Sequence, residues 1–101
     1  MSVLNPTQPS LLCDAQGRPY FLWDCELTLD AFRGLLVDPD PATRAYAIAK
    51  LMRQAKPDDV FTFVSLREIQ EHWTTIAHQL GTQRDFWTWL LRSWGAVADA
   101  A

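Results

Sequence analysis

The stretch LLVDPDPATRAYAIAKLM, residues 35–52, contains the end of one predicted helix, a tight corner and the start of the next helix. Pro39 and Pro41 cannot continue a helix and favour extended geometry in the residues before them, so a helix through Leu36 must end just before Pro39. Asp40 suits the N-cap position and Pro41 the first helical position, where a missing N–H has no cost. The stretch therefore predicts an antiparallel pair of helices.

Each helix of this pair has an apolar side. In the first, Thr28 can act as the N-cap, and Asp30 lies in the first turn, where a negative charge favours the helix dipole. Its apolar residues are Leu29, Phe32 and Leu36. The second helix is predicted from Pro41 to Ala55, with small or apolar residues at three- and four-residue spacing. These residues are Ala45, Ile48, Ala49, Met52 and Ala55.

Two further helices are predicted between residues 57 and 80. The first is short and begins at Pro57, and its inward residues are Val60, Phe61 and Phe63. Ser65 and Glu68 have the spacing of a capping box and predict a helix over Leu66–Leu80, which Gly81 ends as a left-handed cap. At roughly 100° per residue the apolar side chains of this helix form one narrow stripe. The stripe consists of Ile69, Trp73, Ile76 and Leu80.

The N-terminal part of the chain has a different pattern. Residues 1–10 contain two prolines and little to bury, so a flexible segment is expected. Asp14 and Gly17 suit the two ends of a four-residue turn. Leu11–Cys13 and Pro19–Leu22 are therefore predicted to pair as a short β-hairpin, with an extended arm across the helices as the alternative.

Together these elements predict a mainly α fold: a compact bundle of about five helices with a short N-terminal β-hairpin or extended arm. The predicted organisation is a flexible segment over residues 1–10, a single helical domain over residues 11–95 and a frayed tail over residues 96–101. A chain of 101 residues buries roughly two thirds of its unfolded surface, so it needs no metal or disulfide to fold. The apolar run YFLW, residues 20–23, is expected to form one wall of the core.

The composition argues against several classes of protein. A net charge of −3 does not favour sequence-independent binding to nucleic acid or to anionic membranes. No stretch approaches the about 18 consecutive apolar residues of a membrane span, and the first ten residues lack the features of a secretory signal. Cys13 and Cys25 have no metal-binding or redox spacing and are expected to be reduced thiols. We therefore expect a cytoplasmic protein.

No residue pattern indicates catalysis, a bound metal or a cofactor. His72 and His78 lie six residues apart, on different faces of a helix, so they cannot share a metal ion. Paired carboxylates occur beside turns and helix starts, where they cap helices rather than converge on a pocket. No nucleophile elbow or phosphate-binding glycine loop is present. A non-catalytic protein is expected; an enzyme would require a cleft lined by Asp24, Glu26 and His72.

The last helix, predicted to begin at Thr82 with Asp85 in its first turn and to end at Gly95, has an unusually wide apolar side. Its large apolar residues are Phe86, Trp87, Trp89, Leu90, Leu91 and Trp94. They cover roughly 200° of the helix circumference, which is more than contact with one core requires. One interpretation is a core that uses tryptophan as filler. The other is a partner-binding surface formed by Trp87, Trp89, Leu91 and Trp94, with a second copy, as a homodimer, or another protein as the partner.

DNA binding is the alternative function. The predicted helices on either side of Gly81 could imitate a helix-turn-helix, and Arg84 and Arg92 could contact phosphates. Only these two arginines lie in the last helix, so nucleic acid is the less favoured partner.

Two resemblances add to these expectations. The run LLVDPDPATRAYAIAKL is similar to the corner between the two helices of a HEAT-type repeat, over residues 29–53. More broadly, PYFLWD at 19–24, KLMRQAKPDDVFTFVS at 50–65 and the tryptophan-rich end resemble a family of small bacterial helical proteins encoded beside nucleotidyltransferase-type toxins. This resemblance implies a cytoplasmic partner protein, such as an antitoxin, that acts by binding rather than by catalysis.

Overall fold

The structure is a computed structural model that describes residues 6–95, and these residues are mainly helical. In chain order the helices are α1 Pro9–Leu12, η1 Tyr20–Leu22, α2 Leu29–Leu36, α3 Pro41–Gln54, α4 Pro57–Phe63, α5 Leu66–Glu71, α6 Trp73–Ala77, η2 Gly81–Gln83 and α7 Arg84–Ser93, where η denotes a 3₁₀ helix. The predicted mainly α fold is confirmed, but seven α-helices within the described part replace the predicted five. Residues 1–5 of the predicted flexible segment and the predicted tail lie outside this part.

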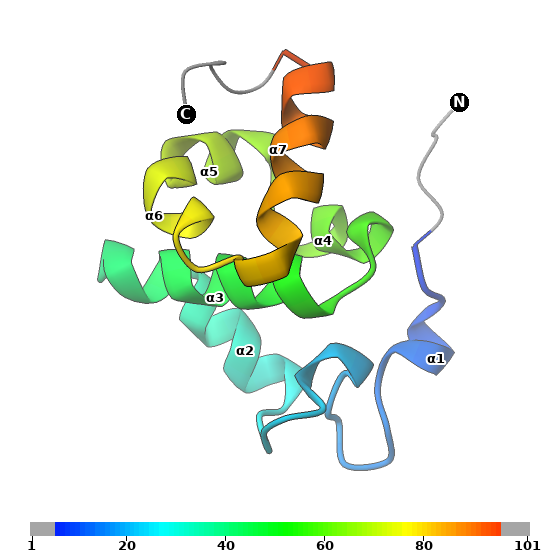
Figure 1. Cartoon of the computed structure of the whole chain (residues 1–101). Helices are drawn as coiled ribbons and strands as arrows, with labels where there is room; N and C mark the ends of the chain where they lie inside the picture. Colours follow the sequence, from blue (N-terminus) through cyan, green and yellow to red (C-terminus); the bar gives the residue numbers. More distant parts are fainter. Residues whose placement is uncertain (1–5, 96–101) are drawn as a thin grey trace.

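Helix α3 is the centre of the fold. It contacts α2, α4, α6 and both 3₁₀ helices, and the other long helices lie across it (Figure 1). The five residues of its predicted apolar stripe are all buried. Every residue from Ala47 to Met52 is also buried, which is typical of a helix surrounded by other elements.

The predicted helix starts are largely confirmed. Thr28 and Asp40 each accept a backbone N–H hydrogen bond of 3.2 Å at the starts of α2 and α3, and Pro41 is the first residue of α3. Ser65 and Glu68 form both hydrogen bonds of the predicted capping box. These short-range contacts fix where three of the helices begin.

The β-hairpin predicted over residues 11–22 is wrong. Helix α1 and the 3₁₀ helix η1 occupy most of the two predicted strands. The predicted turn does form, because the Gly17 amide donates to the Asp14 carbonyl at 3.1 Å and Gly17 has a φ of +78°. Strand pairing is limited to one bridge between Cys13 and Pro19, since proline has no N–H to extend a ladder.

The helix predicted over Leu66–Leu80 is divided into α5 and α6. The division falls at His72, whose φ of −109° and ψ of 10° are not helical. His72 begins the run HWTT, residues 72–75, in which every residue has weak helix propensity. The predicted stripe still faces the core, since Ile69, Ile76 and Leu80 are buried and Trp73 packs against them.

The boundaries of α7 are partly as predicted. The predicted N-cap Thr82 is wrong, because this residue lies within η2 and α7 starts at Arg84 without a side-chain cap. Gly81 has the predicted left-handed conformation, with a φ of +56°, but it does not cap the preceding helix, because α6 ends at Ala77 and Gly81 begins η2. Gly95, with a φ of +67°, directly follows the C-cap residue of α7, as predicted for the residue that ends this helix.

The wall of the core expected from residues 20–23 is only half formed. Phe21 and Leu22 are buried, and the Phe21 ring packs edge-on against Phe32 and Phe63 at centroid distances of 5.5 and 5.6 Å. Tyr20 and Trp23 are exposed. Successive side chains of a 3₁₀ helix point about 120° apart, so four consecutive residues cannot all face one core.

Candidate functional site

Two of the four predicted partner-binding residues of α7 belong to the core. Trp87 and Leu91 are fully buried, and the Trp87 indole nitrogen donates a hydrogen bond of 2.8 Å to the Met52 carbonyl oxygen of α3. These two side chains therefore attach α7 to the bundle and are not part of the exposed surface of the chain.

The other two predicted residues are exposed. Trp89 is 62% exposed and Trp94 is 46% exposed. Phe86 is also exposed, and its ring centroid lies 6.2 Å from that of Trp89. Trp94 lies at the C-terminal end of the helix, 5.6 Å from the ring of Phe61. At about 100° per residue Trp94 lies roughly 140° from Trp89, on the side of Trp87, so it is exposed but separate from the pair Phe86 and Trp89. We call Phe86 and Trp89 the α7 aromatic surface.

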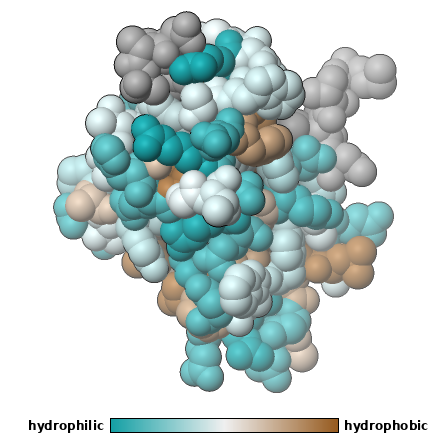
Figure 2. All heavy atoms as spheres, in the orientation of Figure 1, coloured by the Kyte–Doolittle hydropathy of each residue, from teal (hydrophilic) through white to brown (hydrophobic). Residues whose placement is uncertain are grey.

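The same helix carries exposed charges beside these rings. Arg84, Asp85 and Arg92 are all exposed. At about 100° per residue, Asp85 and Arg92 lie on one line along the helix, within about 60° of Trp89. In the view of Figure 2, the side on which α7 runs shows hydrophilic atoms, atoms of intermediate hydropathy and a smaller group of hydrophobic atoms.

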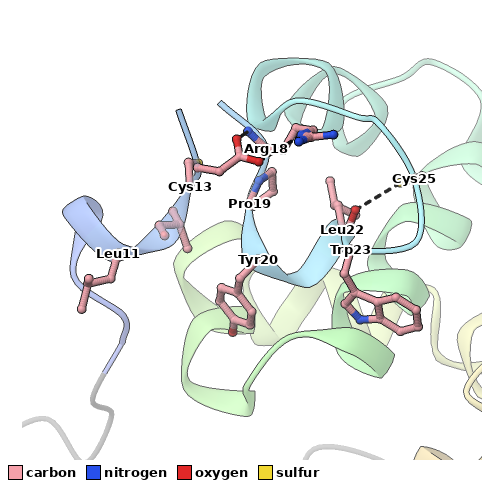
Figure 3. Close-up of a pocket in the computed structure, with 10 residues that line it drawn as sticks. Leu11, Cys13, Arg18, Pro19, Tyr20, Leu22, Trp23 and Cys25 are labelled. Carbon is pink, nitrogen blue, oxygen red and sulfur yellow. Dashed lines mark hydrogen bonds and ion pairs between the residues drawn. The ribbon is translucent and has the colours of Figure 1, made fainter. Parts of the chain in front are cut away.

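A second exposed apolar region surrounds a groove between α1 and η1 (Figure 3). The groove has a volume of about 410 Å³ and is lined by Leu11, Leu12, Cys13, Asp14, Arg18, Pro19, Tyr20, Leu22, Trp23 and Cys25. Trp23 is 76% exposed and Leu11 is 70% exposed. Hydrophobic atoms gather over the position of α1 in Figure 2. Tyr20 and Trp23 point from η1 in similar directions, as Figure 3 shows.

The polar groups of this groove already have partners within the chain. The Arg18 guanidinium forms an ion pair of 3.0 Å with the Asp14 carboxylate. Hydrogen bonds from the Arg18 amide, the Gln16 amide and the Arg18 side chain lower the pKa of Asp14. Burial and the neighbouring Asp14 carboxylate raise the pKa of the Cys13 thiol, which therefore stays protonated and weakly nucleophilic.

A buried carboxylate joins the N-terminal residues to α4. Asp59 is almost fully buried and accepts hydrogen bonds from the Thr7 amide at 2.5 Å, the Thr7 hydroxyl at 2.6 Å and the Tyr20 hydroxyl at 2.6 Å. The Tyr20 oxygen in turn accepts a hydrogen bond of 2.8 Å from the Lys56 amide. Burial and the hydrogen bond to Asp59 raise the pKa of Tyr20 to about 12. This cluster is structural, since each of these oxygens is satisfied inside the chain.

Sequence reasoning missed this cluster. Asp58 and Asp59 are one of the carboxylate pairs that lie beside a predicted helix start, here the start at Pro57, and Thr7 lies within residues 1–10, the predicted flexible segment. The one available signal was a tyrosine beside a buried apolar run, because a half-buried tyrosine hydroxyl requires a partner. The identity of that partner, 39 residues away, could not be read from spacing.

A second buried charge lies on α3. Lys50 is buried, and its ammonium group lies 2.9 and 3.1 Å from the two carboxylate oxygens of Asp24. The Lys50 ammonium holds the pKa of Asp24 below its usual range. Asp24 therefore serves as the counter-charge of a buried lysine. An enzyme would instead require Asp24 to line a cleft together with Glu26 and His72.

The geometry also bears on metal binding and on the DNA-binding alternative. Among the described residues, no group of three or more His, Cys, Asp or Glu side chains could hold a metal ion. Residues 78–83 separate α6 from α7, whereas a helix-turn-helix uses a turn of three or four residues. Within residues 6–95, no helix combines the length and apolarity that crossing a bilayer requires.

Comparison of the chain with models of protein families, with curated protein sequences and with solved structures found no match. The functional assignment therefore depends on the exposed side chains of the chain itself.

Proposed function

We propose that this protein is a non-catalytic interaction module that binds a protein partner through the α7 aromatic surface. The observation that supports this most directly is Trp89, which is 62% exposed and lies beside exposed Phe86. Tryptophan is strongly enriched among residues that contribute most of the binding energy at interfaces. Covering these rings on binding removes apolar area from water, which favours association.

The way α7 is held also supports this proposal. Trp87 and Leu91 are buried on the opposite side of the helix from Trp89, and Trp87 is hydrogen-bonded to α3. The exposed rings are therefore displayed on a helix that is fixed to the core. A surface that is ordered before binding loses less conformational entropy when a partner docks.

The resemblance of residues 19–94 to small bacterial proteins encoded beside nucleotidyltransferase-type toxins supports a partner class. In this proposal the chain is the antitoxin or accessory partner of such a toxin and acts in the cytoplasm. Its contribution would be to bind and cover the toxin, which requires no catalytic residue of its own.

The test is co-expression with the product of the neighbouring gene, followed by measurement of the affinity between the two purified proteins. Trp89→Ala is expected to weaken binding by at least about tenfold, because it removes a central aromatic anchor. Trp23→Ala is the matched control, since it removes a more exposed tryptophan from a different surface. Equal affinity for wild type and Trp89→Ala would exclude the α7 aromatic surface. Salt-sensitive binding to duplex DNA without protein binding would favour the alternative function.

A further inference from the structure

We infer that the partner occupies the α7 aromatic surface with an arginine side chain, whose guanidinium stacks on the Trp89 ring and pairs with the Asp85 carboxylate. This inference rests on the proposed function, because it names the chemical group that binds to the same surface. It depends on a carboxylate and an aromatic ring that lie together without a cation of their own.

Asp85 and Trp89 lie on the same exposed side of α7. They are four residues apart, which is about 6 Å along the axis with an angular offset of about 40°. Side chains of a helix lean toward its N-terminus, so the Trp89 ring extends over the turn that contains Asp85 and Phe86. The distance of 6.2 Å between the ring centroids of Phe86 and Trp89 agrees with this direction. Asp85 is therefore placed at the edge of the α7 aromatic surface.

Neither group has a cation within the chain. Within residues 6–95, no lysine, arginine or histidine forms an ion pair with Asp85, and no guanidinium lies over the Trp89 ring. Arg92 is exposed on the same side, but it already has an interaction of its own within the chain. Residues 1–5 and 96–101 contain no lysine, arginine or histidine. Asp85 is thus an exposed carboxylate whose counter-charge a partner can supply.

The carboxylate and the ring share one preferred ligand, which is a cation. An aromatic ring attracts a cation over its face, and tryptophan does so most strongly among the aromatic side chains. A carboxylate accepts hydrogen bonds from a guanidinium or an ammonium group. An apolar group on Trp89 would instead remove the neighbouring carboxylate from water without giving it a donor, which is unfavourable. The surface is therefore matched to a basic partner, and the net charge of −3 of the whole chain favours the same choice.

Arginine fits this arrangement better than lysine. The guanidinium is planar, so it can stack on a ring and donate N–H groups to a carboxylate at the same time. The ammonium group of lysine is a compact point charge that is strongly hydrated. The chain itself contains the aromatic half of such a contact, because the Arg33 guanidinium lies 5.5 Å from the centroid of the Phe63 ring.

The groove between α1 and η1 lacks this feature. Its lining also includes an exposed tryptophan, Trp23, but the two charged residues that line it, Asp14 and Arg18, pair with each other. The groove therefore specifies neither the charge nor the class of a partner.

The first experiment measures binding of a defined probe to the full chain by NMR, through the signal of the Trp89 indole N–H. The probe is a tripeptide with blocked ends and arginine between two glycines, and its control has citrulline, a neutral analogue, in place of arginine. A surface ion pair and an exposed cation–π contact are each weak, so we expect a dissociation constant on the order of millimolar or weaker for the arginine peptide. The citrulline peptide should bind at least about threefold more weakly, because it lacks the charge.

Asp85→Asn removes the charge with little change in shape and should weaken binding of the arginine peptide about threefold. Asp30→Asn is the matched control, because Asp30 is also exposed in the first turn of a helix, α2, but four residues later that helix has Gly34 instead of an aromatic residue. This control should bind the peptide as wild type does. Equal binding of the arginine and citrulline peptides, or of wild type and Asp85→Asn, overturns the inference. A lysine peptide that binds as tightly as the arginine peptide overturns the choice of arginine.

The complex with the product of the neighbouring gene tests the same contact with a whole partner. Asp85→Asn should weaken this complex about fivefold to tenfold, whereas Asp30→Asn should leave it unchanged. Replacing the partner's contacting arginine with glutamine should have the same effect as Asp85→Asn. Combining the two changes should add little, because both remove one interaction.

The outcomes separate the two proposals. If Trp89→Ala weakens the complex and Asp85→Asn does not, the proposed function stands and the arginine contact is overturned. If the neighbouring gene product does not bind but the arginine peptide binds through Asp85, the cation site stands and that partner is overturned.

Discussion

The indole nitrogen of Trp87 donates a hydrogen bond of 2.8 Å to the carbonyl oxygen of Met52. Met52 lies in the last turn of α3, where the carbonyl oxygens have no N–H donor within their own helix. A side chain from α7 therefore supplies the donor for this carbonyl and links the two helices. The exposed position of Trp89 on the other side of α7 depends on this contact.

Trp87→Phe tests this relationship. The variant keeps an aromatic ring but removes the N–H donor and leaves a buried carbonyl without a partner, so it should lower the free energy of unfolding by about 2–4 kcal/mol. Urea denaturation measures this change. Trp89→Phe is the control, and because its ring is exposed it should change stability by no more than about 0.5 kcal/mol. Equal effects of the two variants would contradict the anchoring role of Trp87.

Asp59 makes the stability of the protein depend on pH. Burial raises the pKa of this carboxyl, but hydrogen bonds from the Thr7 hydroxyl, the Tyr20 hydroxyl and the Thr7 amide outweigh that effect and bring the pKa below the usual 3.8. The unfolded chain therefore binds a proton more readily than the folded chain. The carboxylate stabilises the fold above the unfolded pKa, and this contribution is lost as the pH falls through the lower, folded value.

Asp59→Asn should therefore lower the free energy of unfolding by about 2 kcal/mol near neutral pH, because hydrogen bonds to a charged acceptor are lost. The difference from wild type should shrink as the pH falls below about 4, where the wild-type carboxyl becomes protonated. Urea denaturation at several pH values measures it. Since the pKa values of Asp14 and Asp24 are also lowered, only the difference between the two proteins isolates Asp59. A difference that stays constant down to pH 2 would show that the charge is not involved.

The local parts of the fold were predictable from sequence, and the long-range parts were not. The caps of α2, α3 and α5 depend on residues two or three positions apart, so Thr28, Asp40 and Ser65 were identified correctly. The β-hairpin was not, because short apolar segments on both sides of a turn suit a helical turn equally well. The missing N–H of Pro19 then limits strand pairing to one bridge.

In the candidate site, too, the local pattern was predictable from sequence and the long-range packing was not. The wide apolar arc of α7 was visible in the sequence, but the part that faces inward depends on where α3 lies. Packing into the core, with the hydrogen bond from Trp87 to α3, buries Trp87 and Leu91 and leaves Phe86 and Trp89 outside. The exposed half of the predicted surface could be assigned only once that contact was known.

The ion pair of Lys50 and Asp24 predicts an order of stability between two variants. Asp24→Asn leaves the buried Lys50 ammonium without its counter-charge, which is strongly unfavourable. Lys50→Met removes the buried charge and keeps most of the side-chain volume, and it leaves Asp24 at the surface in contact with water. Lys50→Met should therefore unfold at a higher urea concentration than Asp24→Asn. The reverse order would show that the lysine is stabilised by something other than Asp24.

Alanine substitutions at two glycines should change the free energy of unfolding in opposite directions. Gly34 lies inside α2 and Gly81 has a φ of +56°, and apart from adjacent residues and the backbone of the same helix, no atom lies within 4 Å of the position that a Cβ would take at either residue. Steric contact therefore does not distinguish the two glycines, and only their backbone conformation does.

Gly34→Ala should raise the free energy of unfolding by about 0.5–1 kcal/mol, because alanine restricts the unfolded chain and favours helix. Gly81→Ala should lower it by about 1–2 kcal/mol, because a Cβ is strained in the left-handed region. Thermal or urea unfolding of both variants measures the difference, and a stabilising effect of Gly81→Ala would show that this residue does not need the left-handed conformation.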